Sequence, residues 1–207
     1  MPRIAILGNI GSGKTELANE LSTLLSWKKA EEPVQQWIDS GFLAEYYNDI
    51  KRYAFSFQIY AFITRLMCYE RTRLGESCIM DSHVLTDKAL MRAQVKLGLL
   101  TDKEAEWYES IYNDCMHLVR DQAKPDIIIY LQCSPQVCHQ RMQERNRIEE
   151  KQISIEYLTI LNNELNQLIT QDLVHEYKVL TIDATKSKNE VLQQVQEAVE
   201  ANKENKQ

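Results

Sequence analysis

The chain has 207 residues and a net charge of −6, a length that suits one domain with a full hydrophobic core. Its acidic balance argues against binding to a nucleic-acid backbone, and no apolar run approaches the ~20 residues of a membrane helix. The 5 cysteines include no CxxC pair, which favours free thiols over disulfides or a zinc site. We therefore expect a cytoplasmic protein without a signal peptide, folded as a single domain over residues 1–207, with a flexible polar tail at 201–207.

Strand-like and helix-like segments alternate along the chain. The expected strands are residues 3–7, a short strand ending near Glu31, and residues 77–81, 126–131 and 178–182. This alternation predicts an α/β fold with a parallel sheet of about five strands and helices on both faces. Residues 155–173 have the apolar spacing of an amphipathic helix. Ligands of such sheets bind at the carboxyl ends of the strands, where Gly8, Glu32 and Asp81 are expected.

The octet GNIGSGKT lies between the first expected strand and a helical pattern, which is the setting of a phosphate-binding loop. Glycine lets backbone N–H groups turn inward where a Cβ would clash. A glycine turn joining a strand to a helix is the alternative, but the context favours a nucleoside triphosphate site. Lys14 is expected to reach the outer phosphates, and the Thr15 hydroxyl can bind Mg²⁺. The expected ligand contacts come from Gly8, Asn9, Ile10, Gly11, Ser12, Gly13, Lys14 and Thr15.

A carboxylate follows the second expected strand. Glu32 precedes Pro33, and the proline keeps it extended at the strand end. A carboxylate in this position can take a proton from a substrate hydroxyl. Considered alone, the segment fits a surface acid beside a turn more simply.

Polar side chains share one face of the next helical segment. Gln58, Ala61 and Arg65 have i, i+3, i+7 spacing. The Gln amide suits the edge of a nucleobase, the small Ala leaves room for a ring, and the Arg supplies fixed donors. The pattern is compatible both with a lined pocket and with an ordinary surface.

Three arginines, Arg141, Arg145 and Arg147, lie close together in the second half of the chain, and the first two share a helical face. In an acidic chain with a phosphate loop they favour a phosphate clamp. They mark an expected arginine-rich lid over residues 141–152. The alternative is a solvated helix with Arg–Glu pairs.

In this order, the clusters resemble the deoxynucleoside kinase family and, more distantly, herpesvirus thymidine kinases. The resemblance runs from Ile4 to about Leu168 on the motifs GNIGSGKT, EPVxxW from Glu32, FSFQxY from Phe55 and RxRxEE from Arg145. It implies a P-loop NTPase fold and transfer of the γ-phosphate of ATP, with Mg²⁺, to the 5′-hydroxyl of a small-molecule deoxynucleoside. It also implies a homodimer.

The resemblance assigns a role to each matched position. The residues of the expected reaction are Glu32 as general base, Lys14 and the lid residues Arg141, Arg145 and Arg147 at the triphosphate, and Thr15 and Asp81 at Mg²⁺. The expected nucleoside contacts are Trp37 in the pocket wall, Tyr47 and Glu150 at the sugar 3′-hydroxyl, Gln58 at the base edge, and Arg65 and Asp87 at the base. Thymidine-preferring members tend to lack that Asp, so we expect a purine deoxynucleoside or deoxycytidine. If Arg65 and Asp87 pair with each other, Gln58 alone contacts the base.

One position departs from the family pattern: Ser82 follows Asp81 where the family has an arginine near the 5′-oxygen. A serine hydroxyl cannot replace a bidentate cation, and a charge-stabilising arginine is worth about 10³–10⁵ in rate in phosphoryl transfer by GTPases. The enzyme is therefore slow, or Arg73 or Lys88 substitutes, or the chain is an impaired nucleotide-binding protein. A nucleoside monophosphate kinase is a further alternative, which Glu32 disfavours because it would repel a phosphorylated acceptor.

Overall fold

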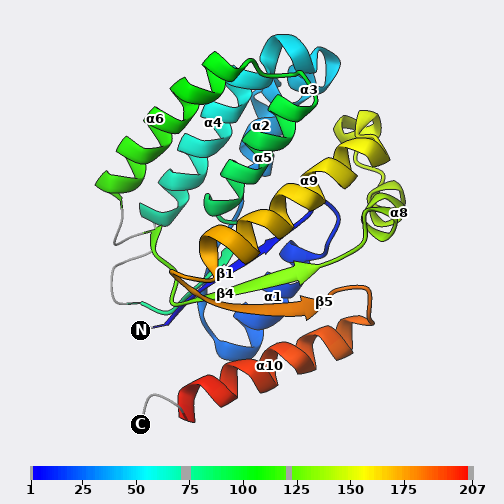
Figure 1. Cartoon of the computed structure of the whole chain (residues 1–207). Helices are drawn as coiled ribbons and strands as arrows, with labels where there is room; N and C mark the ends of the chain where they lie inside the picture. Colours follow the sequence, from blue (N-terminus) through cyan, green and yellow to red (C-terminus); the bar gives the residue numbers. More distant parts are fainter. Residues whose placement is uncertain (1, 71–75, 120–122, 205–207) are drawn as a thin grey trace.

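The computed structural model describes residues 2–70, 76–119 and 123–204 (Figure 1). Five parallel strands form one sheet in the order β2-β3-β1-β4-β5. The strands are β1 (Arg3–Gly8), β2 (Lys28–Ala30), β3 (Cys78–Asp81), β4 (Ile127–Gln132) and β5 (Lys178–Asp183). The predicted α/β class and all five predicted strands are thus confirmed, with boundaries that differ by one residue or so.

Helices connect successive strands and cover the sheet on both faces (Figure 1). The segment between β2 and β3 holds three of them, and α9 continues into a π-helical turn, η2. In chain order the helical elements are α1 (Lys14–Leu25), α2 (Val34–Asp39), α3 (Phe42–Asn48), α4 (Ile50–Glu70), α5 (Leu85–Lys96), α6 (Asp102–Leu118), α8 (Pro135–Arg145), the 3₁₀ turn η1 (Ile148–Gln152), α9 (Ile155–Gln167), η2 (Leu168–Leu173) and α10 (Lys188–Glu204).

The hydrophobic core has two layers because side chains of a strand alternate between the faces of the sheet. On β1, Ile4 and Ile6 pack in the cluster that contains α1 and α10, whereas Ala5 and Leu7 pack in the larger cluster that contains α4, α5, α6 and most of α9. Figure 1 shows α10 below the sheet and α4, α5, α6 and α9 above it. Both faces of the central strands are therefore buried, as a parallel sheet requires.

Several predicted features have a defined place in this fold. The amphipathic segment 155–173 forms α9 and η2, and α10 runs to Glu204, into the segment expected as a tail. Residues 205–207 lie outside the described part of the chain. Within the described residues no disulfide joins any of the five cysteines, which are Cys68, Cys78, Cys115, Cys133 and Cys138. Among the described residues, no helix has the length and apolar character needed to cross a membrane.

The connection from β3 to α5 contains a histidine that is 0% exposed. The backbone N–H of Leu85 donates to His83 Nδ1 at 3.2 Å, so Nε2 carries the proton that reaches the Ala123 carbonyl at 2.7 Å. Burial lowers the pKa of His83 from 6.5 to about 4. The folded protein therefore holds this imidazole neutral under conditions in which the unfolded chain protonates it.

We predict that His83 makes the fold sensitive to acid. Between pH 6.5 and pH 4 the unfolded state binds the extra proton, so the free energy of unfolding falls as the pH falls, by roughly 3 kcal/mol from this group. Chemical denaturation of a His83→Gln variant across that range should show a smaller loss than the parent protein.

The matched control is His175→Gln, at an exposed position, which should leave the pH dependence unchanged. Burial raises the pKa of Asp81 and of Asp87 to about 6, so these two carboxyls make the free energy of unfolding rise as the pH falls through this range. The quantity to compare is therefore the difference in pH dependence between variant and parent. Equal pH dependence in His83→Gln and the parent would contradict the prediction.

Candidate active site

A cavity of about 770 Å³ opens at the carboxyl edge of the sheet. Its wall includes the glycine-rich loop, Glu32, and side chains from α2, α3, α4, α5, α8, η1 and α9. Every residue that the sequence singled out for the site lines this cavity except Asn9, Asp81 and Asp87. One chamber therefore contains the phosphate loop, the carboxylate that follows β2 and the arginine-rich segment.

The glycine-rich loop adopts backbone conformations that favour glycine. Gly11 and Gly13 have φ values of 78° and 98°, in the left-handed region. A Cβ on Gly11 would lie 2.4 Å from the carbonyl oxygen of Cys138 in α8. The Lys14 ammonium donates to the Gly8 and Asn9 carbonyls at 3.1 and 2.9 Å. The loop is thus folded around its own lysine and packed tightly against α8.

Asn9 supports the loop from behind. It is 1% exposed, and its side-chain amide donates to the Leu158 carbonyl in α9 at 2.9 Å while its Oδ1 accepts from the Ile10 N–H at 2.8 Å. Its side chain is therefore committed to protein contacts, which accounts for its absence from the cavity wall.

Thr15 and Asp81 form an oxygen cluster at the base of the phosphate loop. The Thr15 hydroxyl lies beside the Asp81 carboxylate and acts to lower its pKa, and the buried Oδ1 of Asp81 has no hydrogen-bond partner within the described protein. Hydroxyl and carboxylate oxygens are the ligands that Mg²⁺ prefers. The residues present therefore fit a Mg²⁺ ion.

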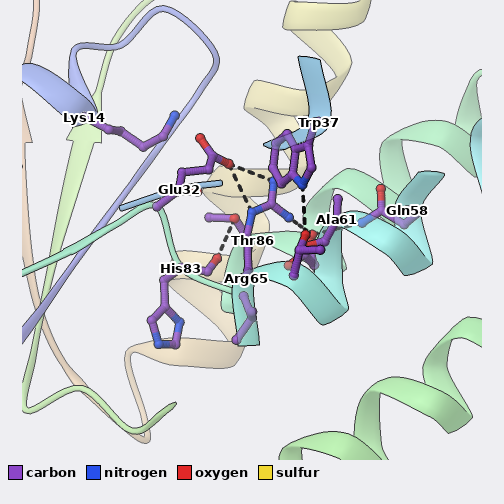
Figure 2. Close-up of polar contacts among 12 residues, drawn as sticks. Lys14, Glu32, Trp37, Gln58, Ala61, Arg65, His83 and Thr86 are labelled. Atoms are coloured by element: carbon purple, nitrogen blue, oxygen red, sulfur yellow. Dashed lines mark hydrogen bonds and ion pairs between the residues drawn. The ribbon is translucent and has the colours of Figure 1, made fainter. Parts of the chain in front are cut away.

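Glu32 is held by a cation from another element (Figure 2). Arg65 on α4 donates from Nε and Nη2 to Glu32 Oε1 at 3.0 and 2.8 Å. The Ser82 side chain also acts to lower the pKa of Glu32. The Glu32 side chain is 19% exposed, so the carboxylate is fixed in direction but still reachable from the cavity.

The charges around Glu32 keep it ionised. Burial acts to raise the pKa of Glu32, but Arg65 and Lys14 outweigh burial and the pKa lies below its ordinary value. Burial lowers the pKa of Lys14, and Glu32 and Asp81 oppose that shift. Figure 2 shows the Lys14 side chain extending from the loop toward the Glu32 carboxylate. The acceptor-side carboxylate and the phosphate-side lysine thus face each other across one chamber.

Arg65 also connects to the base-binding residues expected from the sequence. Its Nη1 donates to Asp87 Oδ1 at 2.5 Å, and the amide of Gln58 donates to the same oxygen at 3.0 Å. Asp87 is 0% exposed and lies behind the wall. Arg65 and Asp87 therefore pair with each other, as one of the two alternatives from the sequence expected. Of these three residues, Gln58 and Arg65 line the cavity and Asp87 does not.

Aromatic side chains complete the wall on this side. The indole N–H of Trp37 donates to Thr64 Oγ1 at 2.8 Å, and the Arg65 guanidinium lies 4.9 Å from the centre of the Trp37 ring. Tyr47 lines the cavity near Glu150 and Tyr157, and burial raises the pKa of its hydroxyl well above the ordinary value. That hydroxyl therefore stays protonated and available as a donor.

The arginines of the expected lid border the cavity, but they also have protein partners. Arg145 and Arg147 both form ion pairs with Glu150, the second with an N–O distance of 2.6 Å. Arg141 donates to the Ser12 carbonyl in the phosphate loop at 3.4 Å. The clamp and the Arg–Glu pairs that the sequence offered as alternatives are therefore both compatible with this segment.

The sequence offered two cations, Arg73 and Lys88, as substitutes for the arginine that Ser82 replaces. Lys88 places its ammonium over the Tyr112 ring, 5.0 Å from its centre, and lines a second cavity, so the expectation that it substitutes is wrong. Arg73 lies outside the described residues. Arg65 is the cation that the described structure places on Glu32, whereas the sequence suggested a contact with the base or a pair with Asp87.

Other wall residues were missed by sequence reasoning. Gln94 on α5, Tyr46 on α3 and Tyr157 on α9 had no motif to distinguish them from core positions. Lys186 and Lys188 also line the cavity. Their position after β5 was a usable signal, because ligands gather at the carboxyl ends of parallel strands.

Comparison with known proteins agrees with this geometry. The family model described as deoxynucleoside kinase matches residues 4–204. The chain belongs to the deoxynucleoside kinase family. Members of this family are ATP-dependent phosphotransferases that act on small-molecule nucleosides, so the predicted enzyme class is confirmed.

The similar proteins within the family differ in substrate. The chain is 33% identical to a probable deoxycytidine kinase of Fowlpox virus over 186 residues, covering 87% of this chain and 77% of the relative. It is 32% identical to the deoxyadenosine kinase of Dictyostelium discoideum over 181 residues, covering 87% and 71%. A structure of deoxyadenosine kinase from M. mycoides with bound dCTP superposes with a TM-score of 0.85 at 26% identity, covering 96% of this chain and 99% of the other. The P-loop kinase fold is thereby confirmed.

Proposed function

We propose that this chain transfers the γ-phosphoryl group of ATP to the 5′-hydroxyl of a deoxynucleoside, with a purine deoxynucleoside or deoxycytidine preferred over thymidine. The observation that carries the proposal is that Glu32, ionised and fixed by Arg65, faces Lys14 within one cavity. A carboxylate so placed is a base for an incoming alcohol.

In the proposed reaction each group acts through its position. Glu32 accepts the proton of the 5′-hydroxyl as its oxygen attacks the γ-phosphorus in line. Lys14 and the inward N–H groups of the loop hold the phosphate oxygens, and Arg141, Arg145 and Arg147 offset the negative charge that moves to the leaving ADP. Arg145 and Arg147 exchange Glu150 for phosphate when residues 141–152 close as a lid, since both are paired with that carboxylate here.

Thr15 and Asp81 are the proposed Mg²⁺ ligands, supported by the unpartnered Asp81 Oδ1. When bound, Mg²⁺ would neutralise charge on the phosphate oxygens. On the nucleoside side, Tyr47 and Glu150 are proposed for the sugar 3′-hydroxyl, and Trp37 for the wall of the base pocket. Gln58 is proposed to contact the base, with Arg65 and Asp87 behind it.

We predict that Glu32→Gln removes the base without removing the site. The amide cannot accept the proton, so kcat should fall by about 10²–10⁴-fold, while the nucleoside still binds. Nucleoside-dependent release of ADP measures the first effect, and calorimetric titration with the nucleoside measures the second.

Glu31→Gln is the control, because Glu31 is the adjacent acid and its exposed carboxylate pairs with Lys29 at 3.0 Å. It should retain parental turnover. Full activity in Glu32→Gln would refute the assignment of the base, and ATP binding without turnover of any deoxynucleoside by the parent protein would refute the proposed function.

A second prediction concerns the cation on Glu32. Removing it in Arg65→Met should raise the pKa of Glu32, so the acid limb of the kcat/KM profile should move to higher pH. At neutral pH we expect kcat/KM to fall about 10–100-fold, the scale of a hydrogen bond to a charged group. Arg65→Lys should recover part of the pH shift.

Arg92→Met is the matched control, because Arg92 pairs with Asp172 at 3.0 Å away from Glu32. Its pH profile should overlay that of the parent. An acid limb that stays in place in Arg65→Met would show that Arg65 does not set the ionisation of Glu32.

We also propose a cytoplasmic location, which suits cysteines that form no disulfide within the described residues.

We further propose a homodimer through the face formed by α4 and α6. Met67 on α4 and Trp107 and Leu118 on α6 are large exposed apolar side chains, and the two helices lie side by side (Figure 1). Trp107 and Leu118 are eleven residues apart and so lie on the same side of α6, and exposed apolar side chains that share a face can mark an interface. Sedimentation should give a dimer for the parent protein and a monomer for a Trp107→Glu/Leu118→Glu variant; a monomeric parent would contradict the proposal.

A further inference from the structure

A glutamine outside every motif continues the hydrogen-bond chain that begins at Glu32. Gln94 on α5 is 2% exposed and belongs to the wall of the cavity. Its Nε2 donates to Gln58 Oε1 at 3.0 Å, and Gln58 Nε2 donates to Asp87 Oδ1 at 3.0 Å. The proposed base-reading amide is therefore gripped at both ends.

The direction of this chain follows from charge. A side-chain amide can present either end to a neighbour, because its oxygen and nitrogen occupy nearly equivalent positions. Asp87, paired with Arg65 at 2.5 Å, is a carboxylate that only accepts hydrogen bonds. It therefore requires the nitrogen of Gln58, which turns the Gln58 oxygen toward Gln94 and makes Gln94 the donor.

Gln94 does not hold this position for the sake of stability alone. Its Oε1 is buried and has no hydrogen-bond partner within the described protein, an arrangement that destabilises the fold relative to a satisfied or apolar side chain. The geometry thus retains a glutamine whose donor is used and whose acceptor is left unpaired.

A locked amide distinguishes two kinds of base. Gln58 keeps one N–H and one oxygen lone pair for a ligand, in a fixed order along the wall. Adenine and cytosine present an exocyclic amino donor beside a ring-nitrogen acceptor, whereas guanine and thymine present a carbonyl beside a ring N–H. A freely flipping amide would match both orders, and a locked one matches only one.

The surroundings favour the amino order. Asp87 and Gln94 contribute oxygen acceptors on either side of Gln58, and one oxygen of each, Asp87 Oδ2 and Gln94 Oε1, has no hydrogen-bond partner among the described residues. Negative charge on these oxygens attracts an amino group and repels a carbonyl oxygen, although Arg65 offsets part of the charge of Asp87.

We propose that Gln94 is a positioning residue for base selection. By donating to the Gln58 oxygen it adds a second hydrogen bond to the amide that Asp87 orients, and so holds the order that favours deoxyadenosine and deoxycytidine over deoxyguanosine and thymidine. The inference rests on the proposed function and narrows its substrate class.

The test compares the parent protein with Gln94→Met, which keeps the side-chain volume and removes the donor. Dissociation constants for the four deoxynucleosides come from calorimetry, and kcat and KM come from ADP release. The parent should favour the two amino bases, and the variant should lose about tenfold of that preference, or about 1.4 kcal/mol, in dissociation constant and KM rather than in kcat. The melting temperature should stay level, because the unpaired Gln94 oxygen is gone while the Gln58 oxygen loses its donor.

Gln193→Met is the control, since Gln193 is exposed on α10 and its amide donates to Glu197 at 2.8 Å. It should leave base preference unchanged. Gln94→Leu is the second variant: it too lacks the donor and adds no charge, so it should lose base preference in the same direction and decides the matter if Gln94→Met does not fold.

Three results would overturn the inference: a parent that prefers the oxo bases or shows no preference, a base preference that survives in the Gln94 variants, or failure of both variants to fold. These results are distinguishable from failure of the proposed function. That failure would appear as absence of turnover with every nucleoside, and the calorimetric preferences would still report on Gln94.

Discussion

One guanidinium holds together two acidic side chains that come from different parts of the chain. Arg65 on α4 bonds Glu32 in the connection after β2 and Asp87 on α5. Without the cation, two negative charges would remain in a site largely removed from water, and an unpaired buried charge of this kind destabilises a fold by about 3–5 kcal/mol. The position of the proposed base, the polarity of the Gln58 amide and the packing of α4 against α5 all depend on this contact.

The same contact gives chemical meaning to Ser82. Ser82 has a φ of 62°, an uncommon conformation for a residue with a Cβ, and its hydroxyl acts to lower the pKa of Glu32. A hydroxyl supplies a hydrogen bond but no charge. The positive charge beside Glu32 comes instead from Arg65 on α4. The absence of an arginine at position 82 therefore does not leave the carboxylate without a cation.

Much of the molecule could be predicted from local signals. The alternation of apolar runs identified the five strands, and strand ends identified where the site would lie. Gly11 and Lys14 were recognisable because a phosphate loop constrains sequence and backbone together. The arginine-rich segment and Gln58 were recognisable as chemistry, although each pattern alone also fitted an ordinary surface.

What could not be predicted depends on pairing across the chain. Arg65 and Glu32 are 33 residues apart, and Gln94 and Gln58 are 36 apart. Periodicity reports which face of a helix is buried, but it does not report which neighbour a polar group on that face meets. Gln94 therefore looked like one position of an amphipathic helix, and Lys88 looked close to the site only because it follows Asp87 in the chain.

The close approach of Gly11 to the Cys138 carbonyl, with Asn9 tied to Leu158, has an energetic consequence for ligand capture. The phosphate loop is braced by α8 on one side and α9 on the other, so its backbone has already lost most of its conformational entropy before any nucleotide arrives. Preorganisation of this kind reduces the ordering penalty of association. The packing that stabilises the fold therefore also lowers the entropic cost of binding a nucleotide.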